Sequence, residues 1–209
     1  MAETRPRTVG RPRAADADRR ILQAALQLYG DAGWHGFNMT KVANLAGVGK
    51  SSMYTRWTNR DCLFLDAFTT LIASPGPIGG TVHEVLRNEV EYRMRLYLGP
   101  QAKAVRRVFV EMASEENATI RAAYRHTYLD PIAEIRAQLW EYKMAGALPV
   151  GTSVVRLLDA IEGSALMRAF CLVPADVECF LTEIDQYAEN LVCDQLYGTA
   201  PRRNLRSVS

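Results

Sequence analysis

The sequence predicts an all-α protein of about nine helices. Apolar residues recur at helical spacing along most of the 209 residues, and no stretch alternates apolar and polar residues as a half-buried strand does. Clusters of glycine and proline separate the helical stretches, and the densest cluster lies at 74–80. This cluster divides the expected fold into an N-terminal three-helix helix-turn-helix domain and a C-terminal helical domain.

The N-terminal domain is expected to cover residues 16–74, after a flexible basic arm at 1–15 in which proline and glycine oppose a helix. A first helix is expected to begin at Asp16 and to end at Gly33. These two residues give the expected bounds of the first helix of the domain.

Two short helices follow in the N-terminal domain. Thr40 is expected to cap the first, which ends at Gly47, and the second covers about 51–57. Two short helices joined by a glycine-containing turn form a helix-turn-helix unit. Asn59 can cap a further helix.

The C-terminal domain is expected to cover residues 81–197, followed by a disordered tail at 198–209. Its first helix begins at a capping box formed by Thr81 and Glu84. Pro131 should interrupt a long helical stretch in the middle of the domain. Two long helices, at about 152–172 and 174–197, carry wide apolar faces and complete the domain.

The charge is unevenly distributed, although the formal net charge is only +2. Residues 1–60 hold ten Lys and Arg but four Asp and Glu, and the remainder of the chain is net negative. A polyanionic partner is therefore expected for the N-terminal domain alone.

The segment Thr40–Trp57, TKVANLAGVGKSSMYTRW, resembles the DNA-binding core of the TetR/AcrR family of bacterial repressors. The resemblance covers about residues 10–70 and continues through Asn59–Leu63. It implies a DNA-binding domain followed by a ligand-binding and dimerisation domain. The chain departs from the family pattern at Gly49, where serine is usual, and at Trp57, where phenylalanine is usual.

The implied function is that of a regulator that releases a pseudo-palindromic DNA operator when a small-molecule effector binds the C-terminal domain. Homodimerisation is expected through the helices at 152–172 and 174–197, because a palindromic site needs two copies of one recognition helix. The alternatives are a small-molecule binding protein or a thiol redox sensor with a helix-turn-helix.

The residues expected to contact DNA share a polar side chain in the basic arm, the two short helices or the start of the next helix. They are Arg11, Arg13, Thr40, Lys41, Lys50, Ser51, Ser52, Tyr54, Thr55 and Arg60.

Several of these residues have a second interpretation. Ser51 could cap the recognition helix instead of contacting bases, Lys50 could be an ordinary surface lysine, and the arm could be a solvated tail. Tyr54 could be a core aromatic residue, and Trp57 is interpreted as one, with an indole N–H that needs a partner.

Aromatic and thioether side chains of the C-terminal domain could surround a hydrophobic ligand, although the same residues could form an ordinary helical core. The expected lining is Tyr92, Phe109, Met112, Tyr124, Tyr128, Trp140, Met167 and Phe170.

The sequence predicts no enzyme, no cofactor and no metal site. The three histidines lie far apart, and neither a phosphate-binding glycine loop nor a nucleophile elbow is present. No apolar run approaches the ~18 residues of a membrane helix, and a cytoplasmic location is expected. Cys171, Cys179 and Cys193 leave a redox role open.

Overall fold

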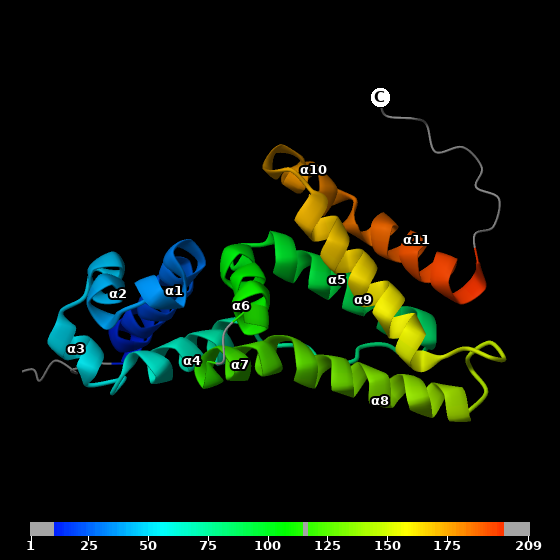
Figure 1. The fold of residues 1–209 in the computed structure, drawn as a ribbon, viewed down its shortest axis with the longest axis horizontal. Coiled ribbons are helices and arrows are strands. Elements are labelled where there is room, and N and C mark those ends of the chain that lie inside the picture. Colours follow the sequence, from blue (N-terminus) through cyan, green and yellow to red (C-terminus); the bar gives the residue numbers. More distant parts are fainter. Residues whose placement is uncertain (1–10, 115–116, 199–209) are drawn as a thin grey trace, which may run out of the picture. The chain divides into compact units, whose positions relative to one another are not determined.

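The computed structural model describes residues 11–114 and 117–198, and these residues are all helical or irregular. The predicted all-α class is confirmed. The described residues form eleven α-helices, one π-helix and one 3₁₀-helix, a few more elements than expected (Figure 1). None of these helices combines the length and apolar composition that crossing a bilayer requires.

The chain forms two compact units, and their division differs from the expected domains. Of the described residues, the first unit holds 11–73 together with 103–114 and 117–127, and the second holds 74–102 together with 128–198. Residues 103–127 therefore pack with the N-terminal helices, whereas their position after the breaker cluster had placed them in the C-terminal domain.

The first unit is built from six helices. They are α1 (Arg11–Gly36), α2 (Met39–Ala46), α3 (Lys50–Tyr54), α4 (Arg60–Leu71), nearly all of α6 (Ala102–Ser114), and α7 (Ala118–Tyr124). Its core is a cluster of aromatic rings in which Phe64 meets Tyr29, Trp34 and Phe37 edge-on, with ring centroids 4.7, 5.2 and 5.6 Å away. Such edge-to-face pairs stabilise a core beyond the area that they bury.

Two helix starts in this unit correct the sequence analysis. Helix α1 begins at Arg11 rather than Asp16, so the expected arm at 1–15 overlaps it, and residues 1–10 lie outside the described part. The N-cap of α2 is Asn38, whose side chain accepts the amide of Lys41 at 2.9 Å. The expectation that Thr40 caps α2 is therefore wrong, because an earlier residue with a better capping side chain takes that position.

Two expected helix signals of the first unit are confirmed, and a third, at Gly33, proves to be a kink within α1 rather than its end. Asn59 caps α4 by accepting the amide of Cys62 at 2.8 Å. Gly47 ends α2 with a left-handed φ of 65°. Gly33, with a φ of 68°, breaks the regular geometry inside α1, where the sequence predicted a helix end.

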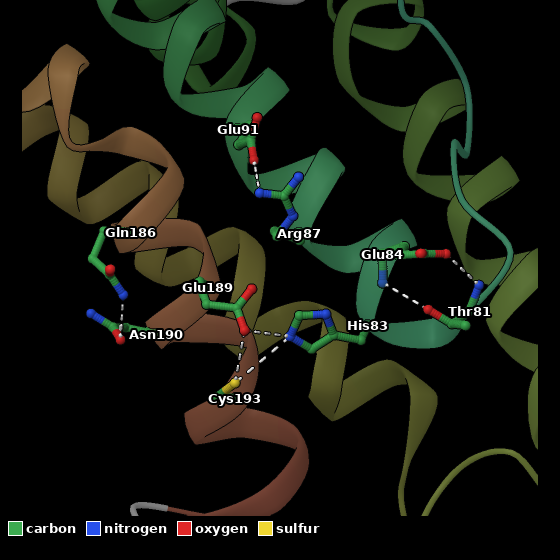
Figure 2. A network of polar contacts seen from close by, with 9 residues as sticks. All are labelled: Thr81, His83, Glu84, Arg87, Glu91, Gln186, Glu189, Asn190 and Cys193. Carbon is green, nitrogen blue, oxygen red and sulfur yellow. Dashed lines mark hydrogen bonds and ion pairs between the residues drawn. The ribbon is translucent and has the colours of Figure 1, made fainter. Parts of the chain in front are cut away.

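The second unit contains α5 (Val82–Leu98), α8 (Asp130–Met144), α9 (Val154–Cys171), α10 (Val177–Thr182) and α11 (Ile184–Tyr197). Helix α5 packs against both α9 and α11, and α8 packs against α9. The predicted capping box at the start of α5 is confirmed, since Thr81 accepts the amide of Glu84 while the Glu84 carboxylate accepts the amide of Thr81 (Figure 2).

The proline interruption is also confirmed. A π-helix at Arg125–Leu129 follows α7, and Pro131 occupies the first turn of α8. A proline is tolerated there because the first amides of a helix have no intrahelical acceptor.

The prediction of one helix over 174–197 is wrong. A 3₁₀-turn at Pro174–Asp176 and α10 precede α11. The helical conformation is interrupted at Glu183, between α10 and α11, where φ is −107° and ψ is 8°. Helix α10 has no buried residue, whereas α11 buries Ile184, Ala188 and Val192 in one row. The two segments therefore differ in burial. A single straight helix would give both segments the same axis, whereas the break at Glu183 lets α11 pack its apolar row while α10 stays exposed.

A buried cluster of charged side chains lies inside the second unit. The Arg93 Nε–H donates to Glu89 Oε1 at 2.6 Å, and the same nitrogen lies 3.3 Å from Glu162 Oε2. All three side chains are at most 4% exposed. One guanidinium therefore faces two carboxyl groups, and burial raises the pKa of Glu162 to about 8, with Arg93 opposing the increase and Glu89 adding to it.

Candidate DNA-binding interface

Helices α2 and α3 form the predicted helix-turn-helix. After α2 the Gly47 amide returns to the carbonyls of Ala43 and Asn44, and the Val48 amide donates to Ala43 O at 3.0 Å. This left-handed turn satisfies the last carbonyls of α2 and directs the chain into α3. Met53 of α3 is fully buried, so α3 is held through one face.

Trp57 lies three residues after the end of α3 and anchors the segment that leaves this helix. The indole ring is 7% exposed, and its Nε1–H donates to Asp66 Oδ2 at 2.7 Å. The prediction that Trp57 packs in the core and that its N–H reaches a partner is confirmed.

The opposite face of α3 is polar and exposed. Lys50, Ser51, Tyr54 and Thr55 are exposed there, and the Tyr54 ring is 51% exposed. Tyr54 is therefore not a core aromatic residue. Exposed donors on a short helix after a tight turn are what base edges and phosphates require.

The alternative in which Ser51 caps α3 is wrong. Helix α3 begins at Lys50, its N-cap is Gly49, and no side chain accepts a hydrogen bond at that end. The Ser51 hydroxyl is thus not used as a cap. Ser52 is half-buried, and its hydroxyl oxygen accepts a hydrogen bond from Arg56 Nη1 at 2.7 Å.

Sequence reasoning missed Arg56, which pairs with Asp18 of α1 and donates to the carbonyl of Ser52. The same contacts hold the end of α3 onto α1. The i,i+4 spacing of Ser52 and Arg56 was the available signal.

Arg60 has internal partners. Its Nη1 donates to the Phe37 carbonyl at 3.2 Å and lies 3.4 Å from the Trp34 carbonyl, and its guanidinium stacks over the Trp34 ring at 4.3 Å. Arg60 therefore joins the start of α4 to the last turn of α1, through Trp34, and to the connector that follows it, through Phe37. A direct contact with DNA stays a prediction.

A concave site of about 360 Å³ lies beside Tyr54 at the N-terminal ends of α2 and α4. Helix N-termini present unsatisfied amides and a positive dipole end, which favour an anion such as a phosphate. The lining residues are Asn38, Met39, Thr40, Tyr54, Thr58, Asn59 and Arg60. Asn38, Thr58 and Asn59 were not expected here, because their signals are those of caps and connectors.

The other expected DNA contacts are placed less completely. Lys41 is exposed on α2, and Thr40 is half-buried in its first turn. The side chains of Arg11 and Arg13 lie outside the described residues, although their backbone belongs to α1.

The expected ligand-lining residues do not share one unit. Phe109 and Tyr124 meet edge-on in the first unit, with centroids 5.2 Å apart, and Met112 belongs to the same unit. Tyr92 and Tyr128 lie on the buried Arg93 of the second unit, with their centroids 5.5 and 5.1 Å from its guanidinium. The remaining three, Trp140, Met167 and Phe170, are 44%, 64% and 46% exposed.

The second unit has a different cavity, of about 580 Å³, that sequence reasoning missed. Arg168 lies over the rings of Phe180 and Tyr187, at 5.5 and 5.7 Å from their centroids. The apolar stripe of the last helices was the available signal, but it was assigned to dimerisation. The lining residues are Arg168, Phe180, Glu183, Gln186, Tyr187, Asn190, Leu191 and Asp194.

Residues 21–67 match the family model described as bacterial regulatory proteins, tetR family. Two uncharacterised HTH-type transcriptional regulators of Bacillus subtilis are similar to part of the chain. YhgD is 40% identical over 57 residues, or 27% of this chain, and YdeS is 29% identical over 80 residues, or 37% of it. These matches span 30% and 40% of the two relatives.

Solved structures show the same fold over most of the chain. A putative fatty acid metabolism regulator of Clostridium perfringens has a TM-score of 0.66 at 14% identity, covering 88% of this chain and all of that one. FadR of Bacillus subtilis, in complex with stearoyl-CoA, has a TM-score of 0.61 at 16% identity, covering 87% and 99%. Together with the match at residues 21–67, the helix-turn-helix identifies the chain as carrying a DNA-binding domain of the TetR family of bacterial regulatory proteins.

Proposed function

We propose that this chain is a ligand-responsive DNA-binding repressor that releases a pseudo-palindromic operator when a small molecule binds its second unit. The observation that carries the proposal is the exposed polar face of α3 beside the concave site at the N-termini of α2 and α4. A base-reading surface and, next to it, a concave site at two helix N-termini that suits a phosphate are the two parts that operator binding needs.

The proposed contacts divide into two kinds. Lys50, Ser51 and Thr55 read base edges in the major groove, where lysine can donate to guanine and hydroxyls can meet several bases. Tyr54 and Thr40 bind phosphate at the concave site, which sets the register but does not specify sequence.

The remaining expected contacts supplement these two groups. Lys41 and Ser52 flank them, and Arg60 orients the site through its bonds to the connector carbonyls. We assign Arg11 and Arg13 to the adjacent minor groove, as basic arms are used by other DNA-binding domains.

Homodimerisation is proposed through α9 and the segment formed by α10 and α11. Met167 and Phe170 on α9 are large, apolar and exposed, and the cavity beside Tyr187 lies on the same helices. An exposed apolar patch of this kind marks an interaction surface, and a palindromic operator needs two recognition helices. Sedimentation equilibrium tests this, and a monomer at micromolar concentration would contradict it.

The effector is proposed to be a small hydrophobic molecule bound by the second unit. Two structural relatives support a ligand with a hydrophobic part, since one was solved with stearoyl-CoA, which carries a long acyl chain, and another is named as a putative fatty acid metabolism regulator. A ligand that prefers a subunit arrangement unsuited to the operator would shift the population away from DNA. We propose that the protein acts in the cytoplasm and that it binds its effector without converting it. Turnover of a bound molecule by the pure protein would contradict the proposal that it is not an enzyme.

The decisive experiment measures operator affinity by fluorescence anisotropy, with DNA from the intergenic region beside the gene and a series of salt concentrations. The double variant Lys50→Ala/Tyr54→Phe should bind at least about tenfold more weakly than the wild type, since it loses one base and one phosphate contact. The control is Arg136→Ala, which removes one charge from an exposed position of α8, outside the proposed dimer surface, and should bind as the wild type does.

Two outcomes would change the assignment. Unchanged affinity of the double variant would show that α3 is not the recognition helix. No binding by the wild type at low salt would favour the alternative of a small-molecule binding protein with a vestigial helix-turn-helix. A redox sensor instead requires that an oxidant changes operator affinity and that Cys171→Ser or Cys179→Ser abolishes the change.

A further inference from the structure

Three side chains of different chemistry converge between the start of α5 and the middle of α11 (Figure 2). His83 Nε2 lies 3.2 Å from Glu189 Oε1 and 3.7 Å from Cys193 Sγ, and the Cys193 sulfur lies 3.5 Å from the same Glu189 oxygen. All three residues belong to the second unit and are half-buried. An imidazole, a carboxylate and a thiol therefore form a closed triangle.

The sides of this triangle have the lengths that a tetrahedral zinc ion imposes. With Zn–N and Zn–O bonds of about 2.1 Å, a Zn–S bond of about 2.3 Å and tetrahedral angles, the ligand atoms lie about 3.4 Å apart for N···O and about 3.6 Å apart for both contacts of sulfur. The observed distances of 3.2, 3.7 and 3.5 Å agree within about 0.2 Å. An ion at normal bond lengths would fit with little movement of the side chains.

The backbone holds the three ligands in place. Glu189 and Cys193 are four residues apart on α11, so they lie one above the other on one face. His83 lies in the first turn of α5, next to the capping box that fixes the start of that helix. The site is therefore built on two packed helices rather than on a loop, which favours a defined geometry.

The electrostatics also favour a cation. Arg87, one turn further along α5, pairs with Glu91 at 2.9 Å, while Glu189 pairs with His83. The His83 and Glu189 side chains are 25% and 43% exposed, so solvent reaches the triangle and could supply a further ligand.

We propose that His83, Glu189 and Cys193 bind a divalent transition metal ion of the zinc class, with a fourth position for water. Imidazole and thiolate together select borderline metals over magnesium or calcium. Binding forms one bond each to Nε2, Oε1 and Sγ and releases the thiol proton to solvent. The bound ion joins α5 to α11, and so connects the body of the second unit to a helix of the proposed dimer surface.

Sequence reasoning predicted no metal site, because it compared the spacing of histidines with one another. His83 and Cys193 are 110 residues apart, and packing of α5 against α11 brings them together. The Glu-x-x-x-Cys pair on α11 was half of the signal, but it does not reveal the third ligand.

Cobalt(II) substitution tests the site in the full chain, freed of any polyhistidine tag and of bound metal by a chelator. The wild type should bind one equivalent of cobalt(II) per chain and show the charge-transfer absorption of a cobalt–thiolate bond. One equivalent of zinc(II) should displace the cobalt and remove this absorption. Cys193→Ser should abolish the charge-transfer band, whereas Cys179→Ser, which removes an exposed thiol of the same unit, should retain it. His83→Gln and Glu189→Gln should weaken binding at least about tenfold.

The outcomes separate a metal site from a hydrogen-bonded triangle. A wild-type cobalt complex without a thiolate band, or a band that persists in Cys193→Ser, would overturn the proposal. Glu189→Gln keeps the shape of the side chain, so unchanged affinity in this variant would also overturn it even if other variants fail to fold. Zinc should raise the melting temperature of the wild type and of Cys179→Ser but not of Cys193→Ser.

Discussion

The buried Glu162 makes stability depend on pH in a direction opposite to that of most carboxylates. Because burial raises its pKa from the ordinary 4.5 to about 8, the folded chain binds a proton at neutral pH that the unfolded chain has released. The stability associated with this proton is fully present below about pH 4.5 and is lost as the pH rises through about 8. Glu162→Gln replaces the protonated carboxyl with a neutral group of the same shape and removes the loss.

The magnitude follows from the pKa difference. While only the folded state holds the proton, each pH unit lowers the free energy of unfolding by about 1.4 kcal/mol, so the wild type should lose about 2 kcal/mol between pH 6 and pH 8 relative to Glu162→Gln. Urea denaturation at pH 6, 7 and 8 measures this difference. Glu141→Gln, at an exposed position of α8, is the control and should follow the wild type. Parallel pH curves for the wild type and Glu162→Gln would refute the reasoning.

Three further predictions concern the first unit. Trp57→Phe should lower the free energy of unfolding by about 1–3 kcal/mol, because it leaves Asp66 without the indole donor. Adding Asp66→Asn to Trp57→Phe should lower the free energy of unfolding by little more. Full additivity of the two substitutions in a double-mutant cycle would disprove the hydrogen bond. Asn38→Ala should cost about 1 kcal/mol in thermal unfolding and Thr40→Ala less, whereas the reverse order would restore Thr40 as the cap of α2. Gly33→Ala should cost about 1 kcal/mol or more in urea denaturation, because φ is 68° and the new methyl group would lie 2.5 Å from a carboxylate oxygen; a neutral result would show that α1 relaxes there.

The sequence predicted the local features well because they depend on residues close together in the chain. The capping box at Thr81, the N-cap at Asn59 and the turn at Gly47 each involve at most five neighbouring residues. The error at Thr40 has the same origin, since Asn38 and Thr40 are both good caps and only the path of the preceding connector decides between them.

The features that the sequence did not predict depend on packing between distant segments. Nothing near Arg60 indicates that its guanidinium stacks on Trp34, and nothing near His83 indicates Glu189. Periodicity identified the apolar stripe of the last helices but could not show the break at Glu183, which has neither glycine nor proline. Helical spacing reports which face is apolar, but it does not report which element covers that face.

The first unit draws on two separate stretches of the chain, and this has a consequence for protein engineering. Glu111 of α6 accepts the Tyr29 hydroxyl at 2.9 Å and the Trp34 amide at 3.2 Å, so α6 supplies a polar partner to the two aromatic residues that pack on Phe64. The chain crosses between the units at 73–74, 102–103 and 127–128, and a single proteolytic cut would leave them covalently linked. A chimera that exchanges operator specificity should therefore carry 103–127 with the helix-turn-helix, because a transplant ending near residue 73 would separate the recognition helix from part of its own scaffold.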